Sequence, residues 1–186
     1  SLFIFSIIWI NYDDAIEALD AHPIFYEGKW VVFFLALKNI IDMGTGVNGQ
    51  IIATSTFWRF DFFSGVILLL LAVPLNIYLV KNYGIIGSAW SNLLAYVIYN
   101  TIRIVFLKRR FNLQPFTVHT AWVLLHGMAC FVITYFLFRG LEGWYAMMLR
   151  TLFFILLSAG TAWYFKVTPD IIPVVHTLAK KLRLRK

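Results

Sequence analysis

Long, continuous apolar segments separated by short polar links run along most of the chain. A membrane-spanning helix needs about 20 predominantly apolar residues, whereas the strands of a membrane β-barrel alternate apolar and polar positions. The continuous segments therefore predict helices, of which the first is too short to cross a bilayer. The predicted spans are residues 1–10 (partial), 30–56, 62–80, 85–107, 117–138 and 145–165.

The composition agrees with a membrane protein. Of the 186 residues, 61% are hydrophobic and 13% are charged, against about 45–50% and about 25% in soluble domains. A soluble domain of similar size still exposes roughly 30% of the surface of its unfolded chain, so it cannot bury such an excess. We therefore predict an all-α, polytopic membrane helix bundle and exclude an ordinary soluble enzyme. The first apolar run lacks a basic start and a cleavage site, so the simplest account is a C-terminal fragment cut inside a transmembrane helix.

Basic residues in the short links predict the orientation, because Lys and Arg favour the cytoplasmic side. Lys108–Arg110 marks one link as cytoplasmic, and the cation-rich segment 166–186 lies two helices later, on the same side. The acidic segment Asn11–Lys29 then faces outward. Since the charge follows the topology, nucleic-acid binding is not indicated. Apolar positions at helical spacing suit a basic, amphipathic cytoplasmic tail over 166–186; a frayed polar terminus is the alternative.

The span 30–56 carries the most unusual residues for a membrane helix. Lys38 and Asp42 are one helical turn apart and can form an ion pair. Charges at membrane depth usually face a protein interior or a wet cavity. The pair therefore indicates either a cavity site for a charged substrate or coupling ion, or a self-neutralised pair with Lys38 reaching toward the surface. These two interpretations are equally weighted.

The same span contains the pattern G-x-G-x-x-G at Gly44–Gly49. A dinucleotide-binding loop would need a strand before it and a helix after it, and here the pattern lies inside an apolar helical stretch. We interpret it as a locally softened membrane helix. Its amides, Asn48 and Gln50, are candidates to face partners other than lipid.

Further polar and small residues lie in the later spans. Amides within spans either hydrogen-bond between helices or line a path; they are Asn76, Asn92 and Asn100. Small residues at every fourth position predict a packing stripe that lets another helix approach; they are Gly87, Ser91 and Ala95. His119 and His126 make a poor metal site, and His126 is interpreted as a hydrogen-bonded packing residue. Nothing resembles a nucleophile elbow, zinc motif or Walker motif, so we predict no enzyme activity, no cofactor and no metal.

Residues 74–92 read PLNIYLVKNYGIIGSAWSN and carry a family resemblance. They resemble the signature LN-x-x-L-I/V-P-x-Y-G-I-x-G-A-A-x-A-T of Wzx-like polysaccharide flippases, in the multidrug/oligosaccharidyl-lipid/polysaccharide exporter superfamily. The signature fits two antiparallel helices joined by a tight turn at Gly84. The matching positions are Asn76, Tyr83, Gly84, Ile85, Gly87 and Ala89. The departures are Lys81 or Asn82 where Pro is common, Ser88 for Ala, and Ser91-Asn92 for Ala-Thr.

The resemblance implies a fourteen-helix, inverted-V transporter with two lobes, of which this chain would be part of the C-terminal one. The implied function is flipping an undecaprenyl-pyrophosphate-linked sugar repeat across the bacterial inner membrane, for polysaccharide and lipopolysaccharide synthesis. The implied partners are membrane lipids, the lipid-linked glycan and the N-terminal lobe, with Na⁺ or H⁺ as the open choice of coupling ion. Two alternatives stay open: a cation-coupled multidrug exporter, and a non-transport membrane protein of glycan assembly.

Overall fold

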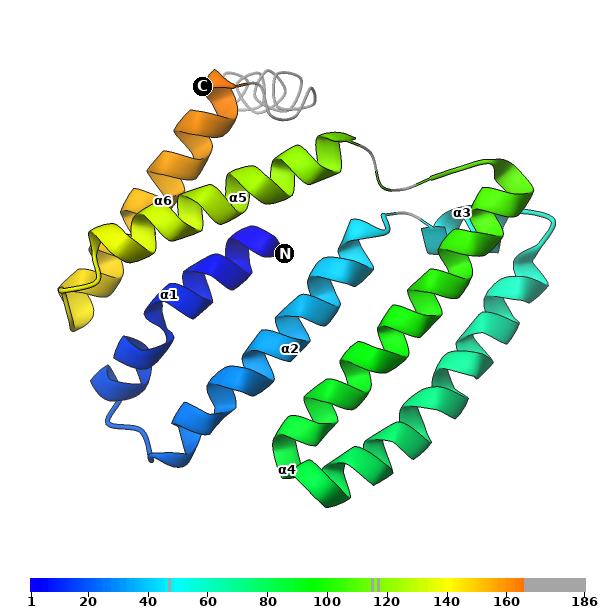
Figure 1. The fold of residues 1–186 in the computed structure, drawn as a ribbon, viewed down its shortest axis with the longest axis horizontal. Coiled ribbons are helices and arrows are strands. Elements are labelled where there is room, and N and C mark those ends of the chain that lie inside the picture. Colours follow the sequence, from blue (N-terminus) through cyan, green and yellow to red (C-terminus); the bar gives the residue numbers. More distant parts are fainter. Residues whose placement is uncertain (47, 115, 117, 166–186) are drawn as a thin grey trace, which may run out of the picture. The chain divides into compact units, whose positions relative to one another are not determined.

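The computed structural model describes residues 1–46, 48–114, 116 and 118–165, and within these ranges the chain forms helices and no strands (Figure 1). This confirms the predicted all-α class. The chain divides into two compact units, Ser1–Thr117 and Val118–Lys186. Each unit is described by itself. The predicted amphipathic tail, 166–186, lies outside the described residues.

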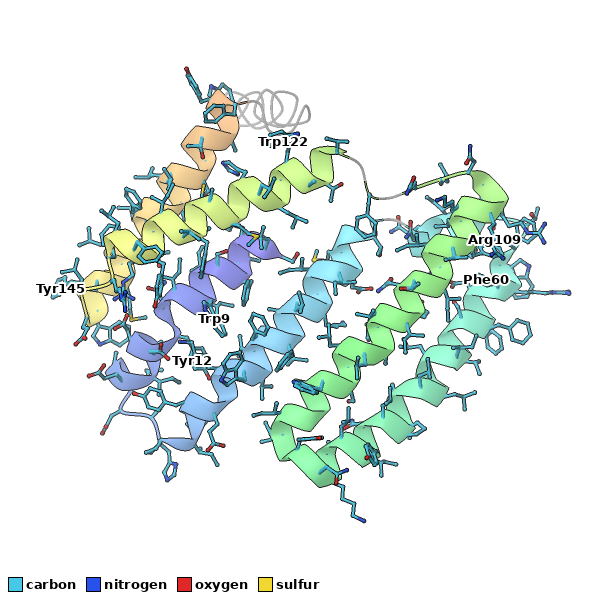
Figure 2. The ribbon with its side chains drawn as sticks, in the orientation of Figure 1. Trp9, Tyr12, Phe60, Arg109, Trp122 and Tyr145 are labelled. Carbon is cyan, nitrogen blue, oxygen red and sulfur yellow. The ribbon has the colours of Figure 1, made fainter. Side chains whose placement is uncertain are left out.

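Helix α1 spans Leu2–Ala18 and α2 spans Ile24–Gly44, and the two helices pack together. Helix α1 extends eight residues past the predicted run 1–10, and α2 begins six residues before the predicted span 30–56, because polar residues such as Asp13 do not interrupt a helix as Pro23 does. Trp9 on α1 contacts the rings of Trp30 and Phe33 on α2 (Figure 2). The segment predicted to be an external acidic link is therefore largely helical.

The predicted span 30–56 is not one helix. Helix α2 ends at Gly44, and a short helix α3 follows at Asn48–Thr54, bent by 49° from it. Gly46 has a φ of 68°, a value that a right-handed helix of L-residues does not contain and that glycine adopts readily. The glycine-rich pattern interpreted as a softened helix thus coincides with a break between two helices.

Helix α4 spans Trp58–Phe111 and folds back on itself as a hairpin (Figure 1). Gly84 interrupts the helical geometry with a φ of 59° and a ψ of −141°, a region that glycine occupies at no steric cost. The limb before Gly84 and the limb after it correspond to the predicted helices 62–80 and 85–107. Tyr83, next to the turn, is largely exposed and stacks on Trp90.

The two limbs lie in close contact at Gly87. A Cβ placed there would lie 2.1 Å from the carbonyl oxygen of Leu79 on the opposite limb, so only glycine fits without a shift of the backbone. Ser91 and Ala95, further along the same stripe, are 1% and 0% exposed. The small residues therefore lie at buried positions, as helices in close contact require.

The second unit consists of α5, Val118–Leu137, and α6, Trp144–Tyr164, which pack against each other. Nε2 of His126 on α5 lies 2.7 Å from Oγ1 of Thr161 on α6, and Sγ of Cys130 lies 3.7 Å from both atoms. Arg150 donates to the carbonyl of Leu141. His126 thus has the hydrogen-bonded packing position that was predicted.

Three helices are long and apolar enough to cross a membrane: α4, residues Thr120–Leu137 of α5, and α6. The bent pair of α2 and α3 qualifies as a fourth if it is counted as one span. Large apolar side chains are exposed along these helices, including Leu70 at 67% and Leu156 at 63%. Soluble monomers rarely expose contiguous apolar surface of this kind, so the chain is a membrane-embedded protein. The number of crossings and their direction stay predictions.

Candidate functional site

A polar cavity of about 390 Å³ lies in the first unit, where the break between α2 and α3 faces the α4 hairpin. Its size is within the usual range of small-molecule sites, roughly 300–1,000 Å³. The contrast with the apolar exterior of the same helices makes it the candidate site. The lining residues are Asp42, Met43, Thr45, Gly46, Asn48, Gly49, Leu68, Tyr96, Tyr99, Asn100 and Arg103.

Arg103, one of the cavity-lining residues, is held by an ion pair within the α4 hairpin. Nη2 of Arg103, on the second limb of α4, donates to Oδ1 of Asp61, on the first limb, at 2.7 Å. The Arg103 side chain is 7% exposed and the Asp61 side chain 35% exposed. The guanidinium also lies over the ring of Tyr99, 4.8 Å from its centroid. Burying a guanidinium is costly unless it is paired, and Asp61 and Tyr99 are the partners that hold the Arg103 side chain in place at the cavity.

The pairing of Arg103 with Asp61 is not among the sequence-based predictions, although the spacing of the two residues around Gly84 indicates it. Asp61 lies 23 positions before Gly84 and Arg103 lies 19 positions after it. In a helical hairpin these two residues differ in depth by about one helical turn. An Asp and an Arg at similar depth on facing limbs are therefore expected partners once the turn at Gly84 is recognised.

A hydrogen-bonded cluster ties the end of α2 to the hairpin. Nδ2 of Asn100 donates to Oδ1 of Asp42 at 3.2 Å, and Oδ1 of Asn100 lies 3.3 Å from Oγ1 of Thr45. The Thr45 hydroxyl also lies 2.7 Å from the Asp42 carbonyl oxygen. Asn100 is 4% exposed. Of the two roles considered for this amide, it has both here, because it links two helices and lines the cavity.

Lys38 and Asp42 do not form the ion pair considered from the sequence. Nζ of Lys38 lies over the ring of Tyr96, 3.8 Å from its centroid, and 3.3 Å from Oδ1 of Asn39. Asp42 instead accepts from Asn100. The neighbouring α4 limb offers each charge its own partner, an aromatic face for the cation and an amide for the anion. Asp42 lines the cavity. Lys38 is not part of the lining, but it contacts the ring of Tyr96, which is.

Asn48 is the most informative residue of the cavity wall. It is 6% exposed, and its Nδ2 finds no hydrogen-bond partner within the part of the chain that the structure describes. Buried amide donors are nearly always paired in native proteins, so this unpaired donor costs the fold free energy at the cavity wall. Gly49 lets the chain pass close to Arg103: a Cβ there would lie 2.9 Å from Nη2 of Arg103.

The other candidate amides lie outside the cavity lining. Gln50 is exposed, and Asn76 is half-buried on the first limb of α4. Nδ2 of Asn92 donates to the carbonyl of Ser88 in its own helix at 3.0 Å. Within the described ranges, no group of three or more His, Cys, Asp or Glu residues is arranged to hold a metal ion. The cavity therefore combines Asp42, Asn48 and Asn100 from the sequence-derived set with Arg103, Tyr96 and Tyr99, which that set lacked.

Replacing Asn48 by Leu is expected to stabilise the fold. The two side chains are similar in volume, and the change removes a buried donor whose desolvation costs about 1–3 kcal/mol when it is unpaired. Thermal unfolding in detergent should show a higher melting temperature for Asn48→Leu. Asn100→Leu is the control, because it breaks contacts to Asp42 and Thr45 and should lower the melting temperature. A lower melting temperature for Asn48→Leu would mean that its amide has a structural partner.

No protein-family model matches the chain, and comparison with curated proteins and with solved structures also gives no match.

Proposed function

We propose that the chain is part of a bacterial inner-membrane flippase that moves a lipid-linked oligosaccharide from the cytoplasmic to the outer leaflet. The observation that carries this proposal is the polar cavity of about 390 Å³ within helices whose other faces are apolar. The resemblance of residues 74–92 to the Wzx-like signature supports it. The chain would form part of the C-terminal lobe, and alternating access against the N-terminal lobe would expose the cavity to each side in turn.

The chemistry of the cavity suits such a cargo. Arg103 is a buried guanidinium, the group that best matches phosphate oxygens. Asn48 and Asn100 add amide groups, and Asp42 adds a carboxylate acceptor. Hydroxyl-rich sugars need donors and acceptors at close spacing, and the ring of Tyr99 adds an apolar face. On this proposal the chain moves its cargo without breaking bonds.

Deleting the gene in its bacterial host tests the proposal. A flippase deletion should abolish surface polysaccharide and leave the undecaprenyl-pyrophosphate-linked repeat accumulated in the cell, and a plasmid copy should restore export. Normal surface glycan together with altered drug resistance would instead favour the multidrug exporter. Normal accumulation of the single repeat with loss of longer glycans would favour a non-transport role in glycan assembly.

Asp42 is the observation that favours the exporter as the second candidate. Its carboxylate lines the cavity, and the partner described for it there is the neutral Asn100 amide rather than a cation. A carboxylate without a protein cation is free to bind a coupling Na⁺ or H⁺. In such an exporter, Asp42 would be the residue at which the ion is bound.

Substitutions of Lys38 and Asp42 separate the two candidates. A flippase needs cations for the pyrophosphate of its carrier, and Lys38, which lies over the cavity-lining Tyr96, would act beside Arg103. Lys38→Ala should then lose most glycan export, and Asp42→Asn should be milder. A cation-coupled exporter should show the reverse order in a drug-efflux assay. Because the two side chains have separate partners, the double variant should be no better than the worse single one. Immunoblotting must show equal protein levels. If the double variant restored transport, Lys38 and Asp42 would be shown to act as an ion pair, against the separate partners described above.

A further inference from the structure

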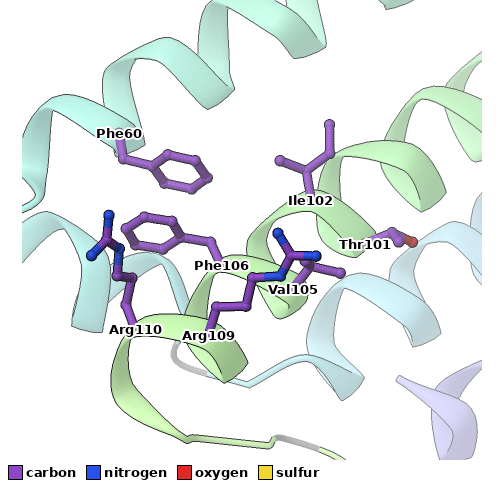
Figure 3. A pocket seen from close by; sticks show the side chains of 7 residues that line it. All are labelled: Phe60, Thr101, Ile102, Val105, Phe106, Arg109 and Arg110. Atoms are coloured by element: carbon purple, nitrogen blue, oxygen red, sulfur yellow. The ribbon is translucent and has the colours of Figure 1, made fainter.

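A second hollow lies at the end of the α4 hairpin where its two limbs begin and end, and it shares no lining residue with the polar cavity. It has a volume of about 610 Å³ (Figure 3). We call it the arginine groove. It is lined by Phe60, Thr101, Ile102, Val105, Phe106, Arg109 and Arg110.

The walls of the arginine groove are apolar along most of its length. Phe60 from the first limb stacks on Phe106 from the second, with ring centroids 3.7 Å apart and planes inclined by 9°. Ile102 and Val105 continue the wall on one face of the second limb, because residues three and four positions apart share a helix face. Val105 is 43% exposed. The groove is therefore an open, apolar channel and not an enclosed pocket.

Two guanidinium groups lie at one end of this apolar channel. Arg109 and Arg110 are exposed, and Figure 3 shows their guanidinium groups on either side of the Phe106 ring in that view. The Arg110 guanidinium also lies 5.4 Å from the ring centroid of Phe57. Figure 2 shows Phe60 and Arg109 at the same end of the hairpin. A ligand of this groove must therefore combine an apolar chain with a negative head.

The electrostatics at this end favour an anion. Arg59 and Lys108 add two further cations next to the groove residues in the sequence. The acid of the first turn of α4, Asp61, is already paired with Arg103. The end of the hairpin thus carries positive charge that the described ion pairs do not neutralise. By the distribution of Lys and Arg, it is also the end predicted to face the anionic cytoplasmic leaflet.

The length of the groove matches the depth of one lipid leaflet. Thr101 and Arg109 are eight residues apart, which is about 12 Å along a helix. Half of the hydrocarbon core of a bilayer is about 15 Å thick. A chain lying along Thr101, Val105 and Phe106 would place its head group beside Arg109 and Arg110 at the membrane surface.

We propose that the arginine groove binds an anionic phospholipid of the cytoplasmic leaflet, with an acyl chain along Phe60, Val105 and Phe106 and the phosphate at Arg109 and Arg110. The lipid would fill the hollow between the ends of the two limbs and hold them together. The proposal rests on the groove and on the predicted cytoplasmic orientation of this end of the hairpin, and it does not depend on what the protein transports.

Lipid titration of the purified protein tests the proposal. Native mass spectrometry would count bound phosphatidylglycerol and phosphatidylcholine with identical acyl chains. The wild type should bind phosphatidylglycerol about tenfold more tightly, as two arginines at an anionic surface allow. Arg109→Gln/Arg110→Gln should lose this preference, and Arg109→Gln alone should lose part of it. Equal affinity of the wild type for both lipids would overturn the proposal.

Matched variants separate the groove from general surface charge. Arg59→Gln/Lys108→Gln removes the same charge from the same end but outside the groove, so it should keep the preference. Val105→Trp should reduce binding of both lipids by filling the channel while leaving the arginines in place. Equal loss in both double variants would show diffuse attraction instead of a site. Displacement by inorganic phosphate at matched concentration, or stronger binding of a polyprenyl phosphate, would assign the groove to a different ligand and overturn the proposal.

Discussion

Asp61→Asn is expected to destabilise the protein by about 1–3 kcal/mol, because its amide oxygen can still accept a hydrogen bond from Arg103 but no longer supplies the negative charge that this buried guanidinium faces. The Arg103 side chain is 7% exposed, so solvent compensates little for the lost charge. Arg103→Leu should cost less, because the stranded Asp61 is 35% exposed and is partly solvated. Denaturant unfolding in detergent would measure both variants.

Two further variants make this prediction specific. Asp61→Asn/Arg103→Leu leaves neither charge stranded and should recover most of the lost stability. Asp13→Asn is the control, since it removes the same kind of carboxylate from the exposed pair with Lys29. Exposed pairs contribute about 0–1 kcal/mol, so Asp13→Asn should be nearly neutral. If Asp61→Asn behaves like Asp13→Asn, the Arg103 guanidinium is not confined by the hairpin.

The helices of the second unit are those that the apolar pattern predicts most closely. The predicted spans 117–138 and 145–165 correspond to Val118–Leu137 and Trp144–Tyr164. In lipid the backbone must satisfy its own hydrogen bonds, so an apolar run without interruption leaves the chain no alternative to a helix. The turn at Gly84 was also predicted, and its combination of a φ of 59° with a ψ of −141° is one that glycine alone readily adopts.

Helix ends outside the apolar runs were harder to predict. Helix α1 continues to Ala18 and α2 begins at Ile24, each several residues beyond the apolar segment. Hydropathy reports where lipid contacts a helix, but it does not report where the helix stops. Helices stop where backbone geometry changes, as near Pro23 and at Gly46 with its φ of 68°. The break between α2 and α3 therefore depended on glycine geometry and not on polarity.

The polar residues of the site could be found in the sequence, but their partners could not. Spacing along one helix offers Lys38 and Asp42 only each other. The neighbouring limb offers Tyr96 to Lys38 and Asn100 to Asp42, and this choice depends on how two helices pack. A cavity near Asp42 and Asn48 could be predicted because polar groups are costly in lipid. Which other residues line that cavity could not be predicted, because this depends on tertiary contacts.

Gly87→Ala is expected to destabilise the hairpin by about 1–3 kcal/mol, the usual cost of overpacking. The added Cβ would lie 2.1 Å from the carbonyl oxygen of Leu79 and 2.4 Å from its carbonyl carbon. Both are backbone atoms, so no side chain can rotate away to make room. The limbs must separate, and the buried Ser91 and Ala95 would lose part of their packing.

Gly65→Ala in the first limb of α4 is the matched control for Gly87→Ala. No atom lies within 4 Å of a Cβ placed at Gly65, and alanine in a helix is favoured over glycine by about 0.5–1 kcal/mol. Gly65→Ala should therefore raise the melting temperature in detergent while Gly87→Ala lowers it, although both make the same chemical change in one helix. Similar melting temperatures for the two variants would mean that the limbs near Gly87 can separate at no cost. The close contact at Gly87 would then not be what holds the hairpin together.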